Sequence, residues 1–158
     1  MDEQAKKTAL RMIPYGLYVL GSRNGDELGA AAVNWVTQAS FQPPLLAMGV
    51  KADSTSLGHL RLKSEFALSI LGTGQKDIAF AFFKPTEKDG QTINGYAFET
   101  QQSGAPILVD APAWVEGRVT DVVERGDHAV IVAEVTNAEV RRESAVLTLV
   151  ECGVNYGG

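Results

Sequence analysis

Cysteine and histidine are scarce in this sequence: among 158 residues there is one cysteine, Cys152, and there are two histidines. One cysteine cannot form an intramolecular disulfide, and the chain has no Cys–His spacing of the kind that binds zinc. Long apolar runs are also missing, so no segment reaches the roughly 20 residues that cross a membrane. The first residues, MDEQAKKTALRMIPYG, lack the apolar centre of a signal peptide. These absences favour a reducing, cytoplasmic location with no membrane contact.

Positive charge is in deficit as well. The 14 Lys and Arg residues are outnumbered by 19 Asp and Glu residues, which gives a net charge of −5 and a pI of about 5.0. This balance argues against a surface that binds nucleic acid or anionic membranes. An anionic small molecule would have to be bound by local donors rather than by the overall field.

Signatures of a catalytic cluster are missing too. No Ser–His–Asp arrangement is visible, and the GTG stretch at Gly72–Gly74 lacks the full G-x-G-x-x-G dinucleotide fingerprint. We therefore predict no catalytic side chain and no metal site. This suits a protein in which a bound cofactor carries the chemistry.

What the chain does contain is enough apolar material for a single domain over residues 1–158. Hydrophobic residues make up 45% of the sequence, and a chain of this length buries roughly 70% of its unfolded surface. Strand-like segments dominate, with a few short helical segments between them, as in a small antiparallel barrel with helices at its ends. The predicted strands lie at about 16–22, 28–41, 45–50, 65–71, 113–124, 128–140 and 146–153, and the helical segments lie within 3–12, 52–64 and 75–84.

Turn residues separate these segments. Asn24-Gly25 predicts a tight hairpin because both residues tolerate positive φ. Pro43-Pro44 cannot donate to a sheet, so strand pairing stops there. Residues 85–104 are polar and rich in turn formers, and ordered connections of that length are often functional.

The segment from Ala32 to Phe41 carries amides and hydroxyls where a core strand would be apolar. The run from Leu28 to Val50 contains no charged residue, so a solvated outer face explains it poorly. Buried amides need partners, because leaving one unpaired costs roughly 1–3 kcal/mol. The segment therefore fits either a flat heteroaromatic ligand or a dimer interface in which amides pair across a two-fold axis. Read as one strand, it has one face of Val33, Trp35, Thr37, Ala39 and Phe41 and another of Asn34, Val36, Gln38 and Ser40.

A second polar group follows at once along the chain. Lys51 ends the next predicted strand, and the stretch Ser54–Ser56 opens the following helix. An ammonium, hydroxyls and N–H groups at a helix start can bind a phosphate. Plain helix capping with a solvated Lys51 is the alternative, and Asp53 would repel a phosphate. Together with the polar strand, this group indicates a phosphorylated aromatic cofactor.

Three segments, in this order, resemble the flavin reductase-like family of FMN-binding split barrels. They are YGLYVLGSRNGDELGAAAVNWVTQASFQPPLLAMGVK, EFALSIL and AWVEGRVTDVVERGDHAVIVAEV. The flavoredoxin and rubredoxin-linked flavin reductase types are the most similar in pattern. The resemblance implies a mainly β, antiparallel split β-barrel with a few short helices. It also implies a homodimer with FMN, less often FAD, near the subunit interface.

The same resemblance implies which residues contact the cofactor. The isoalloxazine ring would face the polar strand, and the phosphate would lie near Lys51 and the hydroxyls that follow it. Lys84 would be a further basic contact, His128 would lie near flavin and nicotinamide, and Tyr156 would cover the ring. Packing remains the alternative for Trp35, and an exposed turn position for His128. The predicted cofactor-binding residues are Asn34, Trp35, Val36, Thr37, Gln38, Ala39, Ser40, Lys51, Ser54, Thr55, Ser56, Lys84, His128 and Tyr156.

For function, the resemblance implies an NAD(P)H:flavin oxidoreductase that passes electrons through flavin to an acceptor, such as a redox protein or a monooxygenase. Two alternatives remain open: an FMN electron-transfer module reduced by a protein partner, and a non-enzymatic split-barrel protein that binds another ligand. Elsewhere, we expect His59 at the surface or at a helix end, Cys152 as a small buried residue, and Trp114 in the core.

Overall fold

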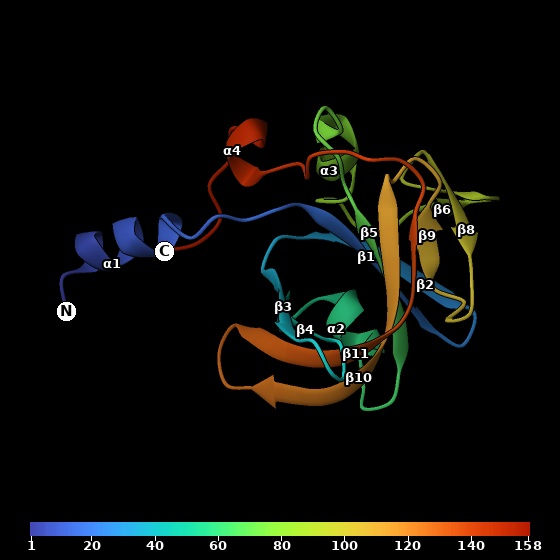
Figure 1. The fold of residues 1–158 in the computed structure, drawn as a ribbon, viewed down its shortest axis with the longest axis horizontal. Coiled ribbons are helices and arrows are strands. Elements are labelled where there is room, and N and C mark those ends of the chain that lie inside the picture. The colour runs from blue at the N-terminus through green and yellow to red at the C-terminus, as the bar shows by residue number, and fades with distance from the viewer.

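The computed structural model describes residues 1–158 and shows a mainly β chain with short helices (Figure 1). The strands are β1 (Tyr18–Asn24), β2 (Glu27–Val33), β3 (Val36–Ser40), β4 (Leu45–Lys51), β5 (Glu65–Ile70), β6 (Lys88–Asp89), β7 (Thr92–Ile93), β8 (Tyr96–Thr100), β9 (Pro106–Leu108), β10 (Ala113–Glu124) and β11 (His128–Val140). The helices are α1 (Glu3–Arg11), α2 (Thr55–His59), α3 (Lys76–Ala81) and α4 (Leu149–Cys152).

One large antiparallel sheet dominates the molecule. Its seven strands follow the order β2-β1-β5-β10-β11-β4-β3, and a second sheet of four strands follows the order β6-β7-β8-β9. Helix α2 contacts β1 and β2 near one edge of the large sheet and β4 near the other edge. The sheet therefore curls around this helix and brings strands together that are distant in sheet order. The prediction of a mainly β, antiparallel fold with a few short helices is confirmed.

The predicted hairpin forms between β1 and β2, but it turns one residue later than expected. Asn24 pairs with Glu27, so the turn residues are Gly25 and Asp26. Gly25 has a φ of 59°, which glycine adopts without the steric penalty of a side chain.

The prediction of a single strand over residues 28–41 is wrong. Strand β2 ends at Val33, and after only two residues the chain enters β3, which pairs with β4 at the opposite edge of the curled sheet. Strand-forming residues flank the break on both sides, so the pattern hides it. The alternating faces therefore differ from those predicted: Asn34 is buried, residues 37–39 are exposed, and Phe41 is 90% exposed.

The prediction of a last strand over residues 146–153 is also wrong. Val146 and Thr148 make only isolated bridges, to Gly72 and Gly16, before α4 begins. The Thr148 hydroxyl accepts a hydrogen bond from the backbone N–H of Glu151, and the helix ends at a glycine, Gly153, with a φ of 69°. A good N-cap and a left-handed glycine C-cap outweigh the β propensity of the sequence between them.

The polar connection of residues 85–104 is more regular than its composition suggests. It contains β6, β7 and β8, which form most of the second sheet. Strands of two residues are too short to show an alternating pattern. Only the pairing with their neighbours reveals them.

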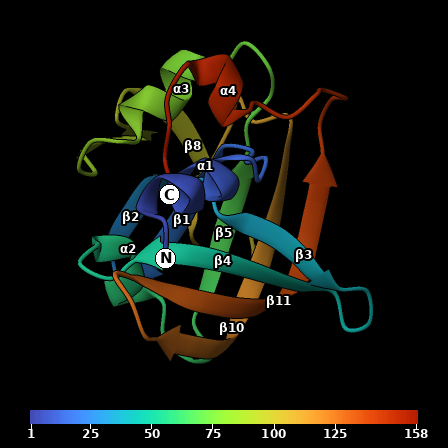
Figure 2. The same cartoon turned by 90° about the vertical axis from the view of Figure 1, so that its left-hand side faces the viewer.

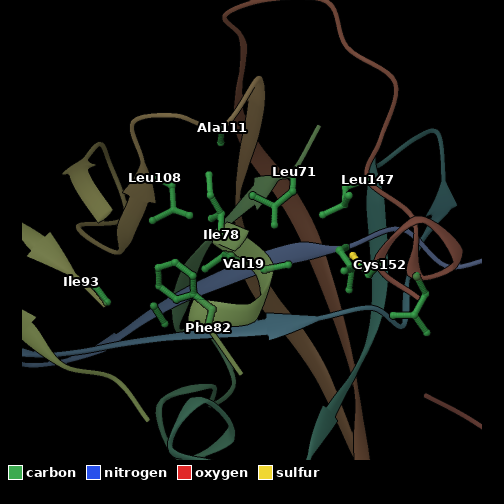
Figure 3. Close-up of a cluster of buried hydrophobic side chains, with 13 residues drawn as sticks. Val19, Leu71, Ile78, Phe82, Ile93, Leu108, Ala111, Leu147 and Cys152 are labelled. Atoms are coloured by element: carbon green, nitrogen blue, oxygen red, sulfur yellow. The ribbon is translucent and has the colours of Figure 1, made fainter. Parts of the chain in front are cut away.

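The core lies in three clusters, the largest where α3 and α4 meet β1 and the second sheet (Figure 3). This cluster contains Val19, Phe82 and Cys152, and the cysteine is 2% exposed, as predicted. Phe66 lies in the second cluster, beneath α2. Trp114 is buried in the third, which confirms the predicted core position. Each large side chain buried in this way stabilises the fold by about 1.5–3 kcal/mol.

His59 ends α2 as predicted, but it is not at the surface. It is 6% exposed, and its Nδ1 lies 3.0 Å from the Ser22 hydroxyl oxygen. Its Nε2 lies 3.7 Å from the carboxylate of Glu27. The ring packs against Gly29, where an added Cβ would lie 3.2 Å from the imidazole. Because α2 packs against β1 and β2, a residue at its end is enclosed rather than solvated.

Helix α1 stands away from the sheets and buries none of its residues (Figure 1). The Asp2 carboxylate caps its first turn. The Arg11 guanidinium donates a hydrogen bond of 3.1 Å to the Gly157 carbonyl, so the two ends of the chain lie together (Figure 2). None of the helices is long and apolar enough to span a membrane.

Candidate functional site

A cavity of about 680 Å³ lies between β2, the start of α2, the connection after α3 and the C-terminal tail. Much of its wall is apolar and includes Leu17, Ala30, Val33 and Phe82. The predicted cofactor-binding residues that line it are Asn34, Lys51, Ser54, Thr55, Ser56, Lys84, His128 and Tyr156. Residues from five separate parts of the chain therefore converge on one space of the size that binds small cofactors.

The pairing of β4 with β11 explains why two of these residues share a wall. Lys51 and His128 lie directly opposite each other in the register of the two strands. The Ala52 backbone N–H also donates a hydrogen bond of 2.9 Å to the Asp127 carbonyl, just beyond the strand ends. The end of β4 and the beginning of β11 are therefore held together at the cavity.

The connection after α3 is held along β2, on the other side of the cavity. The Ala32 backbone N–H donates to the Phe82 carbonyl at 3.0 Å. The Thr86 hydroxyl accepts from the Ala30 N–H at 3.0 Å and donates to the Ala30 carbonyl at 3.1 Å. Lys84 lies between these two attachments, which hold its backbone beside the cavity that it lines.

Asn34 is the residue whose environment most clearly points to a ligand. It is 8% exposed, and its Nδ2 is buried without any hydrogen-bond partner. An unpaired buried donor costs about 1–3 kcal/mol, and Asn34 belongs to the cavity wall. A ring with hydrogen-bond acceptors in its plane, such as the flavin ring, would satisfy this donor. The residues present therefore fit the predicted cofactor.

Lys51 and Asp53 form an ion pair on the same wall. The Lys51 Nζ lies 3.0 Å from Oδ1 and 3.2 Å from Oδ2 of Asp53. This hydrogen bond and the opposite charge raise the pKa of Lys51 and lower the pKa of Asp53. The ammonium predicted to bind a phosphate is thus already paired with a carboxylate of the protein.

The hydroxyls after Asp53 differ in how they are used. The Ser54 hydroxyl accepts a hydrogen bond from the Leu57 N–H at 3.1 Å and donates to the Lys51 carbonyl at 2.7 Å. It therefore acts as the N-cap of α2, which is the alternative to phosphate binding that the sequence left open. Thr55 and Ser56 line the cavity beside it, Thr55 exposed and Ser56 buried.

His128 belongs to a chain of hydrogen bonds that reaches the C-terminal tail. Its Nδ1 lies 2.9 Å from the Asp127 carboxylate and its Nε2 lies 2.8 Å from the Tyr156 hydroxyl. The hydrogen bond from His128 lowers the pKa of Asp127. If the carboxylate accepts from Nδ1–H, then Nε2 of the neutral ring accepts from the Tyr156 O–H. The Trp35 ring packs beside this chain, 4.5 Å from His128 and 5.3 Å from Tyr156 between ring centroids.

The remaining predicted residues do not line this cavity, although the Trp35 ring packs against its His128 and Tyr156. Trp35, Val36 and Thr37 line a second cavity of about 770 Å³, which lies between α1 and the outer face of β3 and β4. Gln38, Ala39 and Ser40 line neither of the two cavities. Two of the polar side chains of β3 bond to its own backbone: the Thr37 hydroxyl donates to the Gln38 carbonyl, and the Gln38 amide donates to the Ser40 carbonyl. Their proposed contact with a flavin ring stays a prediction.

Several cavity residues were missed because they are apolar or lie in irregular segments. Phe82 and Phe83 belong to the end of a helical segment whose pattern indicates packing. Val154 and Asn155 precede Tyr156 in the tail. Only Tyr156 carried a signal there, and that signal came from the family resemblance.

Comparison with known proteins gives a consistent result. The family model described as "Flavin reductase like domain" matches residues 10–156. The chain is 32% identical over 143 residues to Diflavin flavoprotein A 1 of Synechocystis sp., covering 90% of this chain and 25% of that protein. It is 26% identical over 159 residues to Flavin reductase of Pseudomonas putida, covering 100% of this chain and 91% of that protein.

A solved structure shows the same fold. The styrene monooxygenase flavin reductase of Pseudomonas putida S12 is similar with a TM-score of 0.72 and 27% identity, covering 85% of this chain and 86% of that one. In contrast, the chain spans only 21–25% of the length of three matching diflavin flavoproteins.

Proposed function

The chain belongs to the flavin reductase-like family, and on that premise we propose that it is an NAD(P)H:flavin oxidoreductase that binds FMN. In this proposal, electrons pass from NAD(P)H via the flavin to an acceptor. The observation that carries it is the buried, unpaired amide of Asn34 on the wall of a cavity that also contains the predicted phosphate contacts.

Each part of the cavity has a role in this proposal. Asn34 donates to the ring of the cofactor, and the apolar wall excludes water from it. Thr55, Ser56 and Lys84 contact the phosphate together with Lys51. When bound, the flavin supplies hydride acceptance and electron transfer, while the protein supplies position and hydrogen bonds. We propose FMN rather than FAD because the polar end offers a single group of phosphate-binding donors.

His128 and Tyr156 close the cavity on the side of the tail. Their hydrogen bond of 2.8 Å holds the tyrosine ring against the cavity wall. The Asp127 carboxylate fixes the orientation of the imidazole. We propose that nicotinamide from NAD(P)H approaches the flavin on this side, with His128 as its contact.

The proposal also includes a homodimer with the split-barrel arrangement of the family. Support comes from β3, an edge strand whose outer face is exposed and uncharged, and from the apolar second cavity beside it. A cytoplasmic location is proposed because the chain has a single cysteine, which is buried and unpaired.

The acceptor is proposed to be a redox protein or a monooxygenase component. The similar structure from Pseudomonas putida S12 is named as a styrene monooxygenase flavin reductase. That name describes the relative, and it makes a monooxygenase partner the first acceptor to test for this chain.

A visible absorption spectrum tests the proposal directly. The purified protein is titrated with FMN, and bound FMN is then exposed to NADH or NADPH without oxygen. We expect saturable binding and bleaching of the flavin band by one of the two donors. Absence of a flavin spectrum together with absence of binding in the titration would overturn the proposal.

A second candidate function is an FMN electron-transfer module. The length comparison favours it, because in the diflavin flavoproteins the matching region is only about a quarter of a longer chain. Such a module would bind FMN but receive electrons from a protein partner. Tight FMN binding without reduction by NADH or NADPH would support this candidate over the first.

A further inference from the structure

The polar end of the cavity contains a carboxylate where a phosphate is expected to bind. Asp53 is the only acidic residue among the 22 residues that line the cavity. It lies in sequence between Lys51 and Ser54, which are both among the predicted phosphate contacts. The cations and hydroxyls around it suit a phosphate, whereas a negative charge at this point repels one.

Asp53 already forms an ion pair with the nearest cation, the ammonium of Lys51. Both of its carboxylate oxygens lie within 3.2 Å of the Lys51 Nζ. The Ser54 hydroxyl is also committed, because it caps α2 and donates to the Lys51 carbonyl. Of the charged groups that line the cavity, Lys84 is the cation that makes no ion pair.

The ion pair is weak enough for a ligand to break. Its side chains are 60% and 74% exposed, and exposed pairs of this kind contribute little to stability. A phosphate that displaces the carboxylate gains Lys51 but stays close to Asp53, because only one residue separates the two. The phosphate then meets the repulsion of a like charge. Whether the pair is kept or broken, the site attracts a phosphate less than its cations alone would.

We propose that Asp53 is a specificity-determining residue that weakens the binding of the flavin phosphate, so that flavin exchanges during turnover instead of staying permanently bound. This inference rests on the proposed function and adds to it how the flavin is used. The repulsion acts on the phosphate alone, since Asp53 lies at the polar end and Asn34 contacts the ring. A reductase that passes reduced flavin to a separate acceptor requires such exchange.

Titrations with two flavins test the inference. FMN carries the phosphate, and riboflavin has the same ring without it. Quenching of flavin fluorescence gives the Kd of each for the wild type and for Asp53→Asn. We expect Asp53→Asn to bind FMN about five- to tenfold more tightly at low ionic strength, with this gain shrinking at about 0.5 M NaCl. Its Kd for riboflavin should change less than twofold, and FMN should dissociate more slowly in stopped flow.

The matched control is Asp26→Asn, which removes the same charge from the exposed β1–β2 turn. It should change neither Kd, and thermal melting should show that both variants are folded. If wild type binds FMN but Asp53→Asn binds it no better, or gains equally for riboflavin, the inference is wrong and the proposed function stands. If wild type binds neither flavin, the proposed function fails, and the inference fails with it.

Discussion

Replacing Asn34 should change the stability of the free protein little and the affinity for the cofactor strongly. Replacing it by alanine removes a buried donor that has no partner, so the free energy of unfolding without ligand should fall by less than about 0.5 kcal/mol. The same change should weaken FMN binding about tenfold, because the ring loses a hydrogen bond. Chemical denaturation and flavin titration measure the two effects.

The control for this variant is Asn24→Ala at the exposed end of β1, which should leave FMN binding unchanged. A large loss of stability in Asn34→Ala with normal FMN affinity would show that the amide serves the fold and not a ligand.

Tyr156 tests whether the hydrogen bond to His128 holds the tail. Tyr156→Phe keeps the ring and removes the hydroxyl that lies 2.8 Å from Nε2. Loss of one such bond is worth about 1 kcal/mol, so amide hydrogens of residues 154–157 should exchange roughly fivefold faster. Hydrogen–deuterium exchange measures this directly. In a His128→Ala background the tyrosine change should have no further effect, and an additive effect would argue against the bond.

Single residues differ in how far the sequence could predict them. Lys51 and Ser56 were placed at the cavity through local signals, a strand end and a helix start. The burial of His59 was not predicted, because it depends on contacts with Ser22 of β1 and Gly29 of β2, two strands that are distant in sequence. The unpaired state of Asn34 was also beyond prediction, because it depends on what surrounds the amide in three dimensions.

At the scale of elements, Glu116 joins three segments of the fold. This carboxylate on β10 is 1% exposed, and it accepts hydrogen bonds from the backbone N–H and hydroxyl of Ser103 and from the side-chain amide of Asn137. Burial alone would raise its pKa, but these hydrogen bonds outweigh burial and hold the pKa below its usual value. The ionised form is therefore stabilised by folding.

The variant Glu116→Gln should lose about 1–3 kcal/mol of unfolding free energy at neutral pH. Its amide would place an N–H against Asn137, whose own oxygen already accepts from the Ala138 N–H. Because the folded pKa lies below the unfolded one, the contribution is present above the unfolded pKa of about 4.3 and is lost as pH falls through the folded pKa. Denaturation at several pH values should show the gap between wild type and variant closing in acid. A gap that stays constant down to pH 3 would contradict this assignment.

Strands and helices were predicted well where a long alternating pattern marks them. They were predicted poorly where pairing with other strands, or a short pair of helix caps, decides where an element begins and ends. Strands β10 and β11 alternate over many residues, and both were predicted with the observed bounds. The break between β2 and β3 was missed because strand formers stand on both sides of it. Helix α4 was missed because its caps, Thr148 and Gly153, act over only four residues.

For the whole molecule, the site depends on the curl of the large sheet. The pairing of β4 with β11 sets Lys51 opposite His128, while β2 brings Asn34 from the other edge of the sheet. Local patterns connected Asn34 with Lys51, but only the resemblance to a family predicted that His128 joins them. Because β3 pairs only with β4 and not with β2, it is an edge strand of the large sheet.

An exposed edge strand normally carries lysine, proline or a covering segment that prevents pairing with another chain. Strand β3 has no charged residue, and Phe41 at its end is 90% exposed. Helix α1 and the residues that follow it add further exposed apolar side chains nearby, including Leu10 and Ile13 beside the second cavity. Exposed apolar surface of this kind is typical of interaction sites.

We therefore expect the protein to sediment in analytical ultracentrifugation as a dimer of its 16.9 kDa chain. Val36→Lys places a charge in the second cavity and should shift the protein towards monomer by at least tenfold in the dimer dissociation constant, because a buried unpaired charge is costly. Val123→Lys, at a 45% exposed position on β10, is the matched control and should remain dimeric. A wild type that is monomeric at tens of micromolar would refute the assembly, and equal weakening by both variants would place the interface elsewhere.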